Sequence, residues 1–412
     1  MSERTEDRRP TCAFVGDQSL VVRCVEIARE QGLDVTAVAS HSSDVLDGVA
    51  ADGTDLIELR RPVDLAAAFT AREVDVLVSV AYLHIIPETV LARATTAINF
   101  HDGPLPHYAG LNVTTWALAN GEVDHGVTWH VMTGDVDRGD VVTSVTFPIE
   151  PGDTALSLNA RCFEAGAESF IDVARALVSG ELDPRQQPDR PGRIYRRRER
   201  PIVVVDPSRP AADTARAIRA VHVGDRVVNT VGSAHLVIDG EPFVATDAEA
   251  IDGGTRPAGS VWSDAGETRI ATVEGELVVR DVRRPDGRPA PAIGSQVSPS
   301  TDLAEALAEH DAALSDHEPW WRRQLADPPD TPTIETLVAV ANAEHPHPDR
   351  PWTAADTLKN VVLRLDYPDG TSRPLIIGLP GDREVDMKRL EAQVAPAVPS
   401  PFEEDDFTKS LM

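Results

Sequence analysis

The stretch of sequence that decides the fold is 97–142, which reads AINFHDGPLPHYAGLNVTTWALANGEVDHGVTWHVMTGDVDRGDVV. It opens on a short apolar strand, predicted over 96–101. Side chains alternate between the two faces of a strand, so Asn99 and His101 lie on the same face. The Asp-Gly-Pro sequence that follows ends the strand. Two hydrogen-bonding side chains therefore stand at the carboxyl end of a strand, where open α/β sheets place their ligands.

A second predicted strand, 126–132, leads into a tight acidic loop at 134–140. One amide, one imidazole and one carboxylate can then converge without a metal or a nucleophilic cysteine. When an amine attacks a one-carbon acyl group, an oxyanion forms that an imidazole and an amide can stabilise. A neighbouring carboxylate favours the protonated imidazole, fixes its tautomer and helps to move the proton that the amine loses. The alternative to catalysis is that the Asn and His side chains only form hydrogen bonds with the loop at the end of their own strand.

A signature of several ordered parts surrounds these side chains. It comprises Asn99, His101, Leu105-Pro106, Gly110 and Asp137-Arg138-Gly139-Asp140. In this order and spacing it resembles the signature of the folate-dependent formyltransferases. The resemblance implies that Asn99 and His101 polarise a formyl group, that Asp137 assists, and that N10-formyltetrahydrofolate is the co-substrate.

The sequence of 99–132 resembles one branch of that family more closely. This branch is the formylation domain that begins some nonribosomal peptide synthetases. This implies transfer to an aminoacyl group on a peptidyl carrier protein. Methionyl-tRNA formyltransferases carry an Arg after Leu-Pro, whereas this chain has His107 and Tyr108, which we expect to contact the substrate. Aminoacyl-tRNA and an amino sugar are the alternative acceptors. A non-catalytic adaptor is disfavoured because the amide, imidazole and carboxylate are all present.

The segment before this stretch predicts a βαβ opening to a parallel sheet. The first strand–helix turn has no Gly-x-Gly-x-x-Gly, which argues against a dinucleotide site. After the buried strand 74–80, the loop 82–87 is apolar and ends in Pro. By resemblance, this loop and the one around Asp137 hold the pterin ring, and the alternative is that its aliphatic residues are plain core. The expected co-substrate contacts are Tyr82, Leu83, Ile85, Ile86, Val136 and Asp137.

The predicted fold is α/β, with a Rossmann-like sheet followed by an OB-like β-barrel and a small α/β module. A basic cluster at 193–200 lies in a predicted linker, and it has two interpretations. One is a solvated linker, which we favour, and the other is contact with a carrier phosphopantetheine or a tRNA phosphate. The expected boundaries are 1–182 for the formyltransferase domain, 183–200 for a linker, 201–297 for the barrel, 298–329 for a helical connector and 330–412 for the last module.

Two later segments carry resemblances of their own. The DHEPWW sequence at 316–321 resembles the connector that leads from such formylation domains into the next synthetase module. The segment 330–412 resembles the editing insertion domain of bacterial-type prolyl-tRNA synthetases, and Lys359 matches its functional lysine. Because the chain stops before the loop that completes the editing pocket, we expect a docking or vestigial module and not an active hydrolase.

Composition limits the partners. The chain has 412 residues, 39 basic and 67 acidic side chains, and a formal net charge of −28. This disfavours a broad nucleic-acid surface or an anionic membrane. Three scattered cysteines (Cys12, Cys24 and Cys162) and a charged N-terminus predict a cytoplasmic protein with reduced thiols. No metal site is expected, since His125 and His130 lack ligand spacing and His345-Pro346-His347 suits a loop.

Overall fold

The structure is a computed structural model of the 412-residue chain. The chain divides into two compact units, Met1–His317 and Glu318–Met412, which are described separately below. The structure describes residues 8–50, 52–188, 192–196, 199–224, 231–264, 266–284, 295–297, 303–309, 312, 338–339, 341–343, 350–356, 358–367, 372–380, 385 and 387–401.

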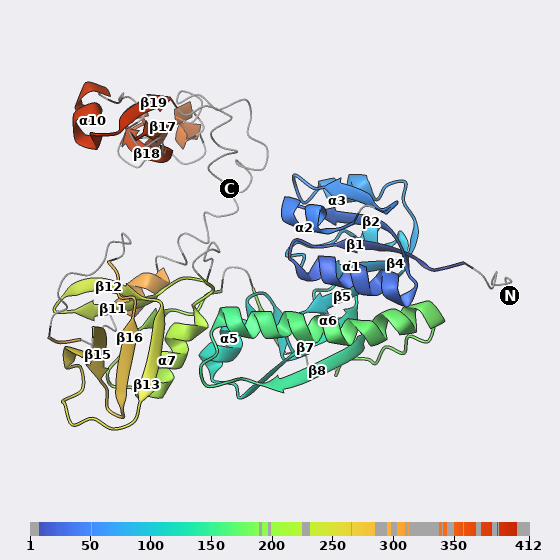
Figure 1. Cartoon of the computed structure of the whole chain (residues 1–412), viewed down its shortest axis with the longest axis horizontal. Helices are drawn as coiled ribbons and strands as arrows, with labels where there is room; N and C mark the ends of the chain where they lie inside the picture. Colours follow the sequence, from blue (N-terminus) through green and yellow to red (C-terminus); the bar gives the residue numbers. More distant parts are fainter. Residues whose placement is uncertain are drawn as a thin grey trace. The chain divides into compact units, whose positions relative to one another are not determined.

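The first unit is built on a seven-stranded sheet with the order β3-β2-β1-β4-β5-β7-β8 (Figure 1). Strands β1 to β5 pair in parallel, and β7 and β8 add an antiparallel edge. This confirms the predicted α/β fold with a mostly parallel sheet. The strands are β1 (Thr11–Val15), β2 (Asp34–Ser40), β3 (Asp55–Glu58), β4 (Val74–Val80), β5 (Ala94–His101), β7 (Asp124–Val131) and β8 (Val141–Pro148).

Helices cover both faces of this sheet, and the alternation of side chains along β1 shows why. Cys12 and Phe14 pack under α1 and α6, which lie on one face (Figure 1). Ala13 and Val15 pack in a second cluster with residues of α3 and α4. A strand buried on both faces reads as a continuous apolar run, as 11–15 does. The helices are α1 (Leu20–Gln31), α2 (Ser43–Gly48), α3 (Asp64–Ala68), α4 (Glu88–Leu91), α5 (Val113–Asn120) and α6 (Ala155–Ser179).

The ends of α6 follow from local chemistry. Thr154 accepts a hydrogen bond from the Ser157 amide while the Ser157 side chain accepts from the Thr154 amide, which forms a capping box. At the other end Gly180 adopts a left-handed conformation with φ of 71°, which ends the helix at low cost.

A smaller β-rich part completes the described portion of the first unit. It forms a three-stranded sheet and a four-stranded sheet that share one core with α7. The ladders of the described residues form two separate sheets, so the predicted OB-like barrel stays a prediction. Its elements are β10 (Val203–Val204), α7 (Ala211–Ala220), β11 (Ala234–Ile238), β12 (Glu241–Ala245), β13 (Asp247–Ile251), β14 (Val261–Asp264), β15 (Glu267–Ala271) and β16 (Glu276–Arg280).

Part of the segment expected to be a linker, 183–200, packs on the first sheet domain. Strand β9 (Arg193–Tyr195) pairs in parallel with β6 (Tyr108–Gly110), and Tyr195 is buried. The physical reason is the aromatic side chain, which stacks on Tyr108 and Trp116 and so removes apolar area from water. Parts of the basic run 193–200 lie outside the described residues.

The second unit contains a hairpin of β17 (Leu358–Asp366) and β18 (Ser372–Pro380), with β19 (Val398–Pro401) on the other side of β17. Helix α10 (Met387–Val394) follows the hairpin. The side chain of Lys359 and most of the connector 298–329 lie outside what the structure describes. Within the described ranges of both units, no helix is long and apolar enough to cross a membrane.

Candidate active site

Strand pairing places three polar side chains on one face of the sheet. Asn99 of β5 stands directly opposite His130 of β7, and Phe100 stands opposite Trp129. Directly paired residues project to the same face. Phe100 and Trp129 pack in the core beneath α6, so Asn99, His101 and His130 project to the opposite face. The register of the two strands therefore brings these three polar side chains together.

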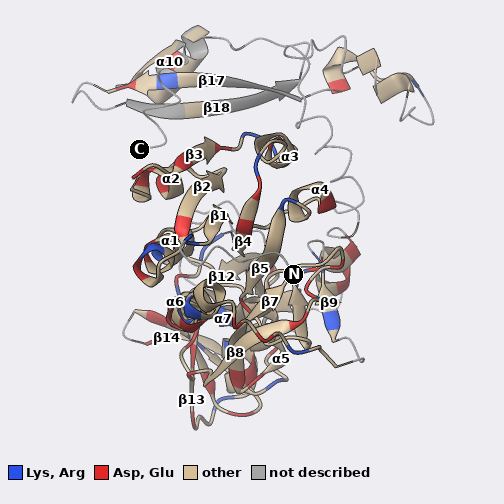
Figure 2. Cartoon of the chain, turned by 90° about the vertical axis from the view of Figure 1, so that its right-hand side faces the viewer, with Lys and Arg blue, Asp and Glu red and all other residues tan. Residues whose placement is uncertain are grey.

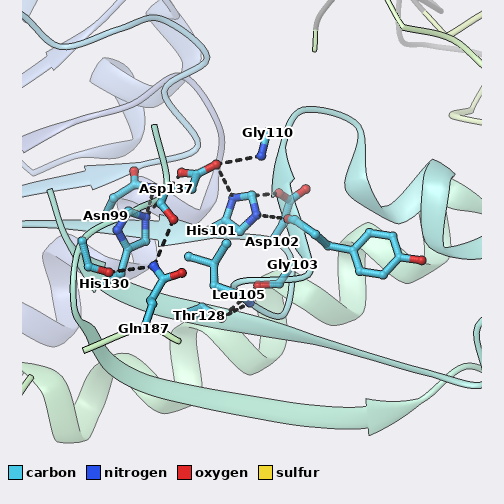
Figure 3. A network of polar contacts seen from close by, with 12 residues as sticks. Asn99, His101, Asp102, Gly103, Leu105, Gly110, Thr128, His130, Asp137 and Gln187 are labelled. Carbon is cyan, nitrogen blue, oxygen red and sulfur yellow. Dashed lines mark hydrogen bonds and ion pairs between the residues drawn. The ribbon is translucent and has the colours of Figure 1, made fainter. Parts of the chain in front are cut away.

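The loop after β7 brings Asp137 to this face (Figure 3). Asp137 has a left-handed backbone with φ of 54°, which Asp tolerates better than most residues. Its Oδ2 accepts a hydrogen bond of 2.8 Å from the amide of Gly110. Gly110 must be glycine, because its φ is +101° and a Cβ there would lie 2.0 Å from the carbonyl oxygen of Tyr195. The glycine of the signature thus allows a close backbone approach and supplies a donor to the carboxylate.

His101 is held between a carbonyl and two carboxylates. Its Nε2 forms a short hydrogen bond with the carbonyl oxygen of Tyr108, so this nitrogen carries a proton. Its Nδ1 lies 3.7 Å from Oδ2 of Asp137 and 3.9 Å from Oδ1 of Asp102. These distances are too long for hydrogen bonds but short enough for strong attraction to a cation. A protonated Nδ1 can therefore remain a donor toward an oxygen that becomes negative.

His130 connects the other two members of the group. Its Nδ1 lies 2.9 Å from the Val131 carbonyl oxygen, and a carbonyl only accepts, so Nδ1 is protonated. Its Nε2 lies 3.1 Å from Nδ2 of Asn99 and 3.5 Å from Oδ1 of Asp137. One Asn99 amide hydrogen is used in this contact, and the second is left to donate to a ligand.

The carboxylate of Asp137 is kept in its charged form. Burial opposes ionisation of this side chain. The neighbouring imidazoles of His101 and His130 and the hydrogen bond from Gly110 outweigh burial, so the pKa of Asp137 lies well below its usual range. At neutral pH Asp137 is thus a fixed negative charge. Its main electrostatic effect is to stabilise a cation on the imidazole beside it.

Two loops at this edge expose aliphatic side chains to solvent. Leu83 is 53% exposed, Ile85 is 78% exposed and Val136 is 47% exposed. These values exclude the plain-core alternative for Leu83 and Ile85, whereas Ile86 packs partly against the core and Tyr82 is buried. Exposed aliphatic side chains at this edge suit contact with an apolar ring.

The two expected substrate contacts differ in placement. His107 is exposed. The Tyr108 side chain is buried, stacks on Tyr195, and donates from its hydroxyl to Glu122 at 2.7 Å. This differs from the expectation of a side chain that touches substrate, because the ring fills an aromatic core and its carbonyl positions His101. A cavity of about 710 Å³ adjoins the Asp137 loop and is bordered by Val136, Arg138, Gln187, Ile194 and Arg196 among others.

Sequence reasoning missed the role of Gln187. Its Nε2 donates to the carbonyl oxygens of Asp137 at 2.9 Å and of Gly139 at 2.7 Å, and the residue is 9% exposed. The side chain thus fixes the loop that carries the carboxylate (Figure 3). It also missed His130 as a partner of Asn99, although counting register from the two predicted strands could have paired them.

We expect Gln187→Ala to lower both the melting temperature and the turnover number. Two buried carbonyls lose their donor, which costs about 1–3 kcal/mol, and the loop that holds Asp137 loses its anchor. A fall of about tenfold in kcat is expected from such misplacement. Thermal melts and steady-state assays measure both effects, and the exposed neighbour Gln186→Ala is the matched control. Equal behaviour of the two variants would contradict the anchoring role.

One segment of the chain matches a known protein family. Residues 24–174 match the family model described as formyl transferase. This segment therefore carries a domain of the formyl transferase family, whose enzymes use a co-substrate of the formyltetrahydrofolate type.

Among solved structures, the fold is similar to WlaRD, a sugar 3N-formyl transferase crystallised in the presence of dTDP and 5-N-formyl-THF. The TM-score is 0.54 at 14% identity, over 66% of this chain and 98% of that one. The N-formyltransferase of Helicobacter canadensis, in complex with folinic acid and dTDP-3-aminofucose, gives 0.51 at 15% identity, over 66% and 99%. At these identities the likeness shows the fold alone.

The C-terminal region has a different relative. It is similar to proline–tRNA ligase of Kineococcus radiotolerans, with 67% identity over 85 residues. The match covers 21% of this chain and 14% of that ligase, so the chain spans only a small part of the ligase.

Proposed function

We propose that this enzyme formylates the amino group of an aminoacyl thioester held on a peptidyl carrier protein, with N10-formyltetrahydrofolate as donor. The observation that carries formyl transfer is the convergence of Asn99, His101 and Asp137 beside two loops with exposed aliphatic side chains. The acceptor class rests on the resemblance of 99–132 and 316–321 to the formylation domain and connector of nonribosomal peptide synthetases.

The co-substrate supplies an electrophilic formyl carbon. The acceptor nitrogen forms a bond to that carbon, and the carbonyl oxygen gains a negative charge. Protonated Nδ1 of His101 and the second Asn99 amide hydrogen donate to this oxygen. The bond from carbon to the folate nitrogen then breaks, the proton lost by the amine reaches the leaving nitrogen, and the formamide and tetrahydrofolate separate. Asp137 stabilises the imidazolium throughout, because it stays ionised.

Charge supports a carrier-bound acceptor over a large nucleic acid. The net charge of −28 repels a phosphate backbone at long range. Figure 2 shows acidic positions distributed over the helices and strands of the chain. A carrier protein presents its amine on a long thioester arm, so only a narrow opening beside His101 would be needed.

Tetrahydrofolate release with a panel of acceptors tests the proposal. The panel contains aminoacyl-carrier thioesters, aminoacyl-tRNAs, nucleotide-linked amino sugars and free amino acids. We expect kcat/KM to be highest with a carrier thioester, and mass spectrometry should show one formyl group on its amine. Turnover restricted to amino sugars or to tRNA would reject the carrier as acceptor.

A second candidate acceptor is aminoacyl-tRNA, because the C-terminal region is similar to a proline–tRNA ligase. In this case tRNA charged with proline would be the best acceptor in the panel. Replacing Lys359 with alanine would then reduce turnover with tRNA and leave turnover with carrier thioesters unchanged.

A further inference from the structure

A second group of ionisable side chains lies at the same edge of the sheet, outside the formyl-transfer site. Asp17 follows β1, His41 follows β2 and His84 follows β4. Strands β2 and β4 flank β1 in the sheet, and all three are parallel. Their carboxyl ends therefore meet at one place, and three distant parts of the sequence contribute to it.

The three side chains lie close to one another. One ligand-type atom from each, a carboxylate oxygen and two imidazole nitrogens, lies within 4.8 Å of the others. Asp17 is well fixed, since its Oδ1 accepts from the amide of His41 at 2.7 Å and from the hydroxyl of Ser40 at 3.2 Å. The side chains of His41 and Asp17 keep 21% and 20% exposure, so a small ion can reach them from solvent.

Hydrogen bonding in the group leaves one nitrogen without a partner. Nδ1 of His41 lies 3.1 Å from Oδ2 of Asp17, a carboxylate that accepts a proton donor. The other ring nitrogen, Nε2, is then an unprotonated acceptor. It is buried and has no hydrogen-bond partner among the described residues. A buried acceptor without a donor is costly in a packed structure, and a cation beside it removes that cost.

The pattern matches a general feature of metal sites. Histidine ligands of metals commonly donate their second N–H to a carboxylate, which fixes the tautomer and makes the free nitrogen more basic. Imidazole nitrogens are also common zinc ligands, and water can fill the remaining positions of a zinc ion. The ring of His84 lies 5.2 Å from that of His41, so a second nitrogen donor stands next to the unpartnered one.

We propose that His41 and His84 bind a divalent transition-metal ion of the zinc class, and that Asp17 holds His41 in the tautomer that can act as a ligand. This goes beyond formyl transfer and revises the expectation from sequence that the chain has no metal site. The ligand-type atoms lie within 4.8 Å of one another, and ~3.3 Å separates the ligands of a tetrahedral zinc site, so small side-chain movements would complete the coordination. Tyr82, whose ring stacks on His41 at 5.7 Å, connects this site with the loop expected to hold the co-substrate.

Titration of the full chain with Co²⁺, after removal of bound metal with a chelator, tests the proposal. We expect visible absorption bands of a nitrogen- and oxygen-ligated ion that saturate near one equivalent and disappear when Zn²⁺ displaces Co²⁺. His41→Gln and His84→Gln should each weaken Zn²⁺ binding by more than about 100-fold, and Asp17→Asn by about 10- to 100-fold. Thermal melts without metal check that each variant is folded.

Two control variants make the test specific. His222→Gln removes a histidine outside the cluster and should bind Zn²⁺ like the wild type. A variant with both His345→Gln and His347→Gln removes the His-Pro-His sequence near the C-terminus, and it should also retain binding. The proposal is overturned if folded cluster variants bind as tightly as the wild type, if binding is lost in the C-terminal variant, or if Co²⁺ produces no bands.

Discussion

His101→Gln is expected to lower kcat for formyl transfer by about 10²- to 10⁴-fold. Glutamine keeps a donor for the Tyr108 carbonyl. It removes the protonated Nδ1, which is the cation that faces the oxygen where negative charge develops. The amine can still bind and attack, so KM for either substrate should change much less than kcat. Tetrahydrofolate release at saturating concentrations of donor and acceptor measures the loss.

The control for this variant must separate loss of chemistry from loss of structure. His101 is only 5% exposed, so a change there can also disturb packing. The melting temperature of His101→Gln should stay close to that of the wild type, and His222→Gln should retain full turnover. Wild-type turnover in a folded His101→Gln protein would contradict a catalytic role for the His101 imidazole.

The parts of the site that lie on one strand could be predicted from the sequence. Alternation along a strand fixes the shared face of Asn99 and His101, and the apolar partners Ile98 and Phe100 fix which face is the core. The breaks at Gly121 and Gly180 are likewise local, because each residue adopts a left-handed conformation that ends a helix. Such features depend on a few neighbouring residues, which the sequence displays directly.

The supporting residues could not be predicted in this way. Gln187 lies 50 residues after Asp137 and has no periodic or turn pattern around it. Tyr195 and β9 belong to a Pro- and Arg-rich stretch whose composition is typical of linkers. The stacking of Tyr195 on two aromatic rings nevertheless packs this stretch against the domain. The Asp17, His41 and His84 cluster depends on the order of strands in the sheet. All three cases require tertiary contacts that no local pattern contains.

The exposed aliphatic residues are an intermediate case. Leu83 and Ile85 have the composition of a core segment, and only a resemblance to a family favoured a binding loop. The structure leaves both side chains in solvent. This excludes a plain core role, which composition alone could not do, and a binding role for both residues stays a prediction.

Asp137→Asn is expected to lower kcat by about 10²- to 10⁴-fold while leaving the loop in place. Asparagine keeps an oxygen that can accept from the Gly110 amide, so the anchor at 2.8 Å survives. The negative charge that stabilises the His101 imidazolium is lost, and the oxyanion donor becomes weaker. Asp135→Asn is the matched control, because it removes an exposed charge from the same loop. An equal loss in both variants would attribute the effect to the net charge of the loop.

The difference in stability between the wild type and Asp137→Asn should also depend on pH in a defined direction. The pKa of Asp137 in the folded state lies below the ordinary carboxyl value of about 3.9. A group of this kind contributes stability that is fully present above its unfolded pKa and is lost as the pH falls through the folded pKa. Wild type should therefore exceed Asp137→Asn in melting temperature by the largest margin near neutral pH, and the margin should shrink in acid. A margin that stays constant down to the lowest pH at which both proteins fold would mean that the charge of Asp137 does not couple to the fold through the two imidazoles.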